Sequence, residues 1–118
     1  MKKLIDTSVL VDNLRRGLFE EGVLSVITLV EVLRGVPEEE RGSVKLLLEE
    51  GYRILGLDNN TILVYCELYS ELRRKGELVP EVDLLLAATA LAHDLVLTTK
   101  NHHFECLEKY GLSLELRG

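Results

Sequence analysis

Cysteine, proline and aromatic residues are scarce in this sequence of 118 residues, and tryptophan and glutamine are absent. The two cysteines, Cys66 and Cys106, form no C-x-x-C pair and have no zinc-type spacing, so we expect two reduced, buried thiols in a reducing compartment. Aromatic residues make up 5% of the chain and hydrophobic residues 47%. The core must therefore consist of Leu, Val, Ile and Ala side chains. It is large enough for one domain, residues 1–118, without disulfides or a structural metal.

Long apolar runs are missing as well. No stretch approaches the ~18 uninterrupted apolar residues that a membrane helix needs. The basic start of the chain imitates a signal peptide, but Asp6 and Asp12 interrupt the apolar segment that would have to follow. We therefore expect a cytoplasmic protein with no membrane contact.

Several functional motifs are absent, and so is an excess of basic residues. There is no G-x-x-x-x-G-K, G-x-G-x-x-G or G-x-S-x-G segment, so nucleotide-binding loops and hydrolase elbows have no support. The net charge of −6 argues against binding nucleic acid through an overall basic surface. It leaves room for an enzyme whose acids hold a cation and whose basic residues are clustered. Arg15-Arg16 and Arg73-Arg74-Lys75 are such clusters, although each alone is more simply a solvated helix end.

Short apolar runs alternate with helical patterns along the chain. The predicted strands are Lys3–Ile5, Val23–Ile27, Arg53–Leu57, Val96–Thr98 and Leu112–Leu116. The predicted helices are Ser8–Arg16, Thr28–Arg34, Pro37–Glu50, Asp58–Gly76, Pro80–His93 and His103–Tyr110. Nearly continuous apolar strands separated by helices indicate a parallel sheet covered on both faces. The fold class is therefore predicted to be α/β, a three-layer α/β/α sandwich around a mostly parallel five-stranded sheet.

The helices offer more apolar surface than one five-stranded sheet readily covers. On the long helix, apolar residues recur at i, i+3, i+7 and i+10, namely Ile62, Tyr65, Tyr69 and Leu72. Val30, Leu33 and Val36 add to this surface. We expect a symmetric homodimer and a partner segment to cover it.

Three acids fall where predicted strands end or the next helices begin. Asp6 directly follows the first strand, where a poorly solvated carboxylate needs a helix N-terminus, a base or a cation. Glu31 follows the second strand and, as the fourth residue of Thr28-Leu29-Val30-Glu31, also fits a capping box. Asp83 begins a nearly all-apolar, hence buried, helix, where it also complements the helix dipole. Each acid alone has an ordinary helix-capping interpretation.

Taken together, these acids predict a metal site at one edge of the sheet. In such sheets the active site lies beyond the carboxyl ends of the strands, where the strand order reverses. Asn101 follows the fourth strand at the same edge, although a simple turn residue is its commoner role. Carboxylates gathered there repel each other unless a cation lies among them, and oxygen ligands select Mg²⁺ or Mn²⁺. His102 and His103 are not expected to be ligands, because adjacent residues at a helix start point in different directions.

Four segments in their order and spacing resemble the motifs of the PIN domain family. They are LIDTSVLVD (4–12), SVITLVEVLRG (25–35), DLLLAATA (83–90) and LTTKNHHF (97–104). The resemblance covers essentially the whole chain and is strongest to the small toxin ribonucleases of VapBC-type toxin–antitoxin pairs. It implies an α/β/α sandwich, divalent-metal-dependent cleavage of RNA, homodimers, and inhibition by a small antitoxin protein.

The resemblance also implies a role for each site residue. Asp6 and Asp83 would bind the Mg²⁺ or Mn²⁺ ion directly, and Glu31 would bind the ion or orient a water on it. Asn101 stands at or beside the position of the family's fourth acid. The residues expected to orient these ligands by hydrogen bonds are Thr7, Ser8 and Thr98.

Two other interpretations stay open. The family has an acid at the position of Asn101 or just before the Phe, where this chain has Asn101 and His103, so a PIN fold that binds without cleaving is one alternative. A receiver-like signalling domain is the other, since Asp58 follows the third strand and Thr98-Thr99-Lys100 follows the fourth. The lone Asp6 after the first strand and the capping position of Asp58 argue against a receiver.

Overall fold

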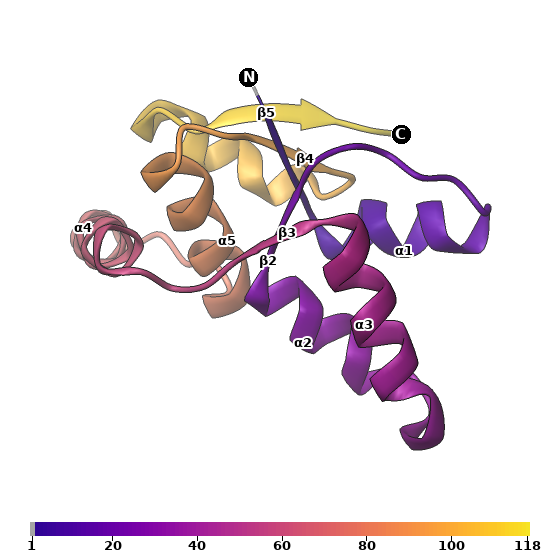
Figure 1. The fold of residues 1–118 in the computed structure, drawn as a ribbon. Helices are drawn as coiled ribbons and strands as arrows, with labels where there is room; N and C mark the ends of the chain where they lie inside the picture. Colours follow the sequence, from indigo (N-terminus) through magenta and orange to yellow (C-terminus); the bar gives the residue numbers. More distant parts are fainter. Residues whose placement is uncertain (1) are drawn as a thin grey trace.

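The computed structural model describes residues 2–118, which are built around a five-stranded sheet in which all neighbouring strands are parallel (Figure 1). The strands are β1 (Lys3–Ile5), β2 (Val23–Ser25), β3 (Arg53–Leu55), β4 (Val96–Thr99) and β5 (Ser113–Leu116). Their order in the sheet is β3-β2-β1-β4-β5. The chain winds from β1 out to β3, returns to the other side of β1 as β4, and ends at β5. The winding direction therefore reverses between β1 and β4, where ligands bind in sheets of this kind.

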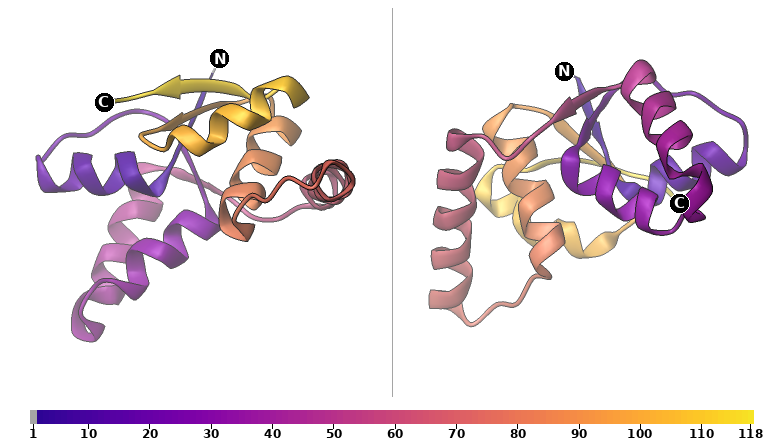
Figure 2. Two further views of the ribbon diagram at one scale, coloured as in Figure 1. Left: turned by 180° about the vertical axis from the view of Figure 1, so that it is seen from behind. Right: turned by 60° about the horizontal axis from the view of Figure 1, so that its bottom comes forward.

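Helices cover both faces of this sheet. They are α1 (Thr7–Arg15), α2 (Val26–Arg34), η1 (Glu38–Glu40), α3 (Arg41–Gly51), α4 (Asn59–Lys75), α5 (Glu81–Ala92) and η2 (His102–Tyr110). In Figure 2, α1, α2 and α3 gather on one side and α4, α5 and η2 on the other. The adjacent, fully buried residues Leu4 and Ile5 contribute to separate core clusters, because successive strand residues point to opposite faces. The predicted three-layer sandwich is confirmed.

Most differences from the predicted elements occur where strands end. β2 ends at Ser25 rather than at position 27, and β3 ends at Leu55 rather than at position 57. The β-branched residues Val26 and Ile27 favoured a longer strand. They begin α2 instead, because the Ser25 hydroxyl accepts a hydrogen bond from the Ile27 N–H at 3.0 Å and so caps the helix. The predicted capping role of Thr28 is therefore wrong.

The long helix α4 divides its apolar residues between the core and the surface. Asp58 caps it as predicted, and its buried residues are Thr61, Leu68 and Leu72. Of the predicted apolar stripe, Leu72 lies in the core, whereas Ile62 is 48% exposed and Tyr69 is 42% exposed. Apolar surface thus remains on the outer side of this helix.

The expectation of two buried thiols is wrong. Cys66 and Cys106 are both free and exposed. Cys66 lies on α4 four residues after Ile62 and three before Tyr69, so it shares their solvent-facing side. No helix within residues 2–118 combines the length and apolar character that crossing a bilayer requires.

Candidate active site

The central strand β1 delivers Asp6 to the carboxyl edge of the sheet. The Asp6 N–H donates to the Thr98 carbonyl at 2.9 Å, which extends the β1–β4 ladder by one residue. Its carboxylate is buried and accepts three hydrogen bonds: from the Thr7 N–H at 2.8 Å, the Ser8 hydroxyl at 2.9 Å and the Thr99 hydroxyl at 2.6 Å. Donors to an ionised group make short, strong hydrogen bonds. The position of the Asp6 carboxylate is therefore set before any ligand arrives.

Glu31 reaches the same edge from α2. Its Oε1 accepts a hydrogen bond from the Thr7 hydroxyl at 2.6 Å, and its Oε2 lies 3.8 Å from the Arg34 guanidinium. Because Ser25 caps α2, Glu31 lies beyond the capping box that the sequence predicted around Thr28. Its carboxylate is thus available for the site, and Thr7 links it to the loop that holds Asp6.

Asp83 completes the group of acids from the first turn of α5. Burial raises the pKa of the Asp83 carboxyl, the nearby His103 opposes this, and the charges of Asp6 and Glu31 raise the pKa further. His103 Nε2 lies 3.5 Å from Asp83 Oδ2. Because the ionisation of Asp83 depends on Asp6 and Glu31, the three carboxylates share one electrostatic environment.

The three acids are neighbours, but they do not yet surround a common point. Within residues 2–118, no three acidic, His or Cys side chains are close enough to hold one metal ion as they stand. Glu31 and Asp83 keep part of their side chains exposed to solvent, at 21% and 15%. The predicted metal site stays a prediction.

One predicted positioning residue is replaced by its neighbour. The Thr99 hydroxyl holds Asp6, whereas the buried Thr98 hydroxyl has no hydrogen-bond partner in the described part of the chain. The prediction for the Thr98 side chain is therefore wrong. Successive strand residues point to opposite faces, so only one of the two can face Asp6, and β4 extends one residue further than predicted. Asn101 contacts the site through its backbone, whose N–H donates to Thr99 Oγ1 at 3.0 Å.

His103 is a site residue that sequence reasoning missed. The prediction that the two adjacent histidines point in different directions is correct, since His102 Nδ1 lies 2.7 Å from Glu105 while His103 faces Asp83. The signal was present in the sequence, because His103 stands just before Phe104, one of the two places where the motif that this segment resembles has an acid. From this position His103 lowers the pKa of the Asp83 carboxyl, against the effect of burial.

Two basic side chains, those of Lys100 and Arg16, lie close to the Asp12 carboxylate on α1. The Lys100 N–H donates to Ser8 Oγ at 3.2 Å, and its Nζ lies 3.3 Å from Asp12 Oδ2. Arg16 lies 3.6 Å from the same carboxylate. Lys100, followed by Arg16, lowers the pKa of the Asp12 carboxyl. Asp12 of α1 therefore anchors two cations.

Comparison with known proteins identifies the family. Residues 3–109 match the PIN domain family. The chain belongs to this family. It is 36% identical over 117 residues to ribonuclease VapC1 of Methanocaldococcus jannaschii, and the match covers 96% of this chain and 86% of that protein.

The PIN fold is also shared with solved structures at 23% sequence identity. VapBC-1 from nontypeable Haemophilus influenzae has a TM-score of 0.80, with 98% of both chains covered. VapBC2 from Rickettsia felis, bound to a DNA fragment from its promoter, has a TM-score of 0.81, with 100% of both chains covered.

The receiver-like alternative is not supported, because Asp58 accepts a hydrogen bond from the Thr61 N–H at 2.9 Å and caps α4.

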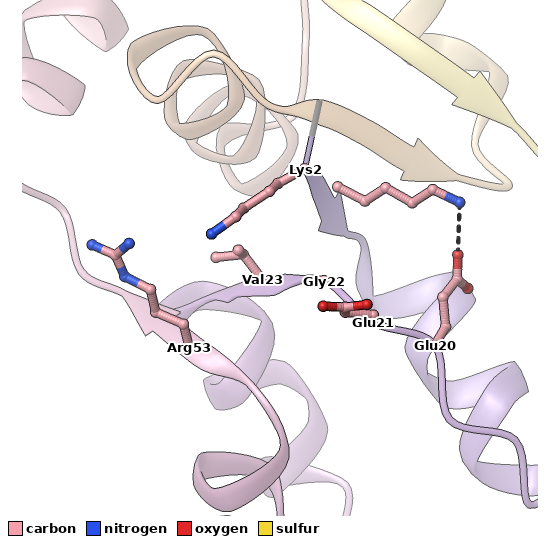
Figure 3. Close-up of a pocket in the computed structure, with 7 residues that line it drawn as sticks. Lys2, Glu20, Glu21, Gly22, Val23 and Arg53 are labelled. Carbon is pink, nitrogen blue, oxygen red and sulfur yellow. Dashed lines mark hydrogen bonds and ion pairs between the residues drawn. The ribbon is translucent and has the colours of Figure 1, made fainter.

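A separate hollow lies at the opposite edge of this PIN fold. It has a volume of about 520 Å³ and is lined at the amino ends of β1, β2 and β3 by Lys2, Lys3, Glu20, Glu21, Gly22, Val23 and Arg53 (Figure 3). None of the three site acids lines it. The acids lie toward the carboxyl ends of the strands, so this hollow is not part of the candidate site.

Proposed function

We propose that this protein is a Mg²⁺- or Mn²⁺-dependent endoribonuclease and the toxin of a toxin–antitoxin pair. The observation that carries the proposal is the buried Asp6 carboxylate, held by three hydrogen bonds beside Glu31 and Asp83. These acids lie where the winding of the sheet reverses. The ribonuclease VapC1 similarity over nearly the whole chain supports the same activity.

The donor set fits a hard divalent ion. Asp6, Glu31 and Asp83 offer only carboxylate oxygens, which a hard divalent ion prefers. Burial raises the pKa of Asp83, His103 opposes this, and repulsion from Asp6 and Glu31 raises the pKa further. In this proposal Asp6 and Asp83 bind the ion directly, Glu31 binds it or orients water, and the Asn101 amide oxygen takes the fourth place. When bound, the ion polarises the phosphodiester and makes water more acidic.

The chain's own residues orient this donor set. Thr99 and Ser8 fix Asp6 Oδ2, the Thr7 N–H fixes Asp6 Oδ1, and the Thr7 hydroxyl fixes Glu31. A single residue, Thr7, therefore sets the relative position of two acids from different elements. Hydrogen bonds of this kind to metal ligands usually matter for metal affinity and rate.

We further propose that the chain acts in the cytoplasm as a single domain, residues 1–118, forms a homodimer, and is inhibited by a small antitoxin protein. The exposed apolar residues of α4 and of α2, among them Ile62, Tyr69 and Val30, supply surface for these contacts. One solved structure with the same fold, VapBC-5 from Mycobacterium tuberculosis, is described as a member of a family of toxin–antitoxin systems.

RNA cleavage by the purified protein tests the proposed function. We expect it to cut single-stranded RNA in Mg²⁺ or Mn²⁺ and to stop when a chelator is added. Asp6→Asn and Asp83→Asn should each lower the rate by about 100-fold or more, because loss of a direct ligand exceeds the usual effect of losing an outer-shell partner.

Asp94→Asn is the matched control. Asp94 has a positive φ of 54°, which Asn tolerates, and it lies beyond the opposite end of the helix that begins near Asp83. This variant should keep full activity, and circular dichroism should be unchanged in all three. Chelator-resistant cleavage, or full activity in Asp6→Asn, would reject the proposed site. RNA binding without cleavage by the parent would favour a binding module.

A further inference from the structure

Arg34 has an exposed guanidinium beside the site with no structural task. It lies in the last turn of α2, its side chain is 72% exposed, and its Nη2 is 3.8 Å from Glu31 Oε2. That separation is too long for a hydrogen bond. An exposed ion pair three residues apart on a helix adds little to stability.

The carboxyl end of α2 does not need Arg34 either. Arg41 Nε donates to the carbonyls of Leu33 and Val36, both at 3.0 Å, and the Gly35 N–H donates to the Val32 carbonyl at 3.1 Å. Since other groups satisfy this helix end, Arg34 is free to bind something that comes to the site.

Lys100 holds a corresponding position on the other flank. Glu31 and Arg34 come from the helix after β2, whereas Lys100 follows β4, and these two strands lie on opposite sides of β1. Lys100 donates its N–H to the same Ser8 hydroxyl that holds Asp6. Lys100 and Arg16 together face the single charge of Asp12, which leaves one positive charge in excess.

The site needs cations on its flanks if its substrate is a polyanion. The chain carries a net charge of −6, and three carboxylates at the site repel phosphate until a divalent ion neutralises part of their charge. Basic groups on both sides then supply the local attraction that the overall surface lacks.

We propose that Arg34 and Lys100 bind backbone phosphates of the RNA strand on either side of the phosphodiester that is cut. This inference rests on the proposed ribonuclease function. It assigns a path to the strand, which crosses the carboxyl edge of the sheet from α2, over Asp6, to the segment after β4. The contacts are to phosphates, so they hold the strand without reading its sequence.

Salt-dependent binding tests this path. A labelled single-stranded RNA oligonucleotide is titrated by fluorescence anisotropy in the Asp6→Asn background, so that no turnover occurs, between about 50 and about 200 mM salt. Adding Arg34→Ala or Lys100→Ala should weaken binding about fivefold to tenfold. Each should also reduce the slope of log Kd against log salt by about 0.7, the value of one phosphate contact on a single strand.

The control variants separate charge from position. Arg53→Ala removes an exposed arginine at the opposite edge of the sheet and should change neither affinity nor slope. Arg34→Lys keeps the charge and should recover most of the salt slope. In a cleavage assay of the parent background, Arg34→Ala and Lys100→Ala should raise KM more than they lower kcat.

The outcomes distinguish this inference from the proposed function. If the parent cuts RNA while both alanine variants keep its affinity and salt slope, the phosphate contacts are wrong and the ribonuclease stands. If Arg34→Ala changes Mg²⁺ affinity but not the salt slope, Arg34 only positions Glu31, and its assignment as a phosphate ligand is overturned. If the parent neither binds nor cuts RNA, both the function and the path are rejected.

Discussion

Two adjacent threonines on β4 show that the direction in which a side chain points decides which groups it can bind. Thr98 and Thr99 are both fully buried, yet within residues 2–118 only the Thr99 hydroxyl has hydrogen-bond partners; it donates to Asp6, 93 positions earlier in the chain. A hydrogen bond to an ionised group contributes more than one between neutral groups, whereas a buried hydroxyl without a partner costs free energy. The same substitution is therefore expected to have opposite effects at the two positions.

Thr99→Val should lower the free energy of unfolding by about 1.5 to 3 kcal/mol, because it removes a donor from the Asp6 carboxylate. RNA cleavage should fall with it, since Asp6 loses the group that orients it. Thr98→Val should be neutral or stabilising, within about 0.5 kcal/mol. Urea denaturation and single-turnover cleavage of both variants provide the measurement. Equal effects of the two substitutions would show that Thr99 is an ordinary core residue.

At the scale of an element, the start of α2 determines where Glu31 lies. The Ser25 cap places the first helical residue at Val26, so Glu31 is the sixth residue of the helix rather than part of its first turn. From there its carboxylate meets the Thr7 hydroxyl of α1. A start at Thr28 would have turned the same carboxylate back to its own helix end.

Ser25→Ala should destabilise the protein by about 1 kcal/mol, because the Ile27 N–H loses its side-chain acceptor. Thr28→Val keeps the shape of a fully buried side chain that does not cap the helix, and it should cost less. Thermal denaturation of both variants tests the assignment of the cap. A larger loss in Thr28→Val than in Ser25→Ala would restore the capping box.

At the scale of the whole molecule, Glu20 joins segments from both ends of the chain. It accepts hydrogen bonds from Lys3 on β1 at 3.2 Å, from Asn13 on α1 at 3.1 Å, and from Arg117 after β5. Arg117, with Asn13 and Lys3, lowers the pKa of the Glu20 carboxyl to about 2. Ion pairs with Glu20 therefore connect the end of the edge strand β5 to β1, in addition to the hydrogen bonds that both strands make with β4.

Folding stability should fall in acid because of this carboxylate. Its pKa is depressed in the folded state, so its stabilising effect is complete above about pH 5 and is lost as the pH falls toward 2. The shift corresponds to at most roughly 3 kcal/mol, reduced by solvent screening. The dependence of the urea midpoint on pH across this range should be weaker in Glu20→Gln than in the parent protein. It should be unchanged in the neighbouring Glu21→Gln. A parallel fall in both variants would place the acid sensitivity elsewhere.

Local pattern was sufficient to predict the order of the elements and the edge of the sheet at which we expect the site. The predicted bounds of Lys3–Ile5 match β1, because three apolar or half-apolar residues ending at an acid have few alternatives. The Asp58 cap and the Gly76 end of α4 also follow from local chemistry, since Gly76 adopts the left-handed conformation with a φ of 69°. Asp6 and Asp83 could be predicted as site residues because each is an acid beside an apolar run.

Only the tertiary structure decided which neighbours those acids have. The choice of Thr99 over Thr98, the approach of His103 to Asp83 and the link from Thr7 to Glu31 all join residues far apart in the chain. Periodicity says that two adjacent strand residues face opposite ways, but not which way either one faces. That is set by packing: Leu4 and Ile5 enter different core clusters, which fixes the rotation of β1 and aligns Thr99 of β4 with Asp6.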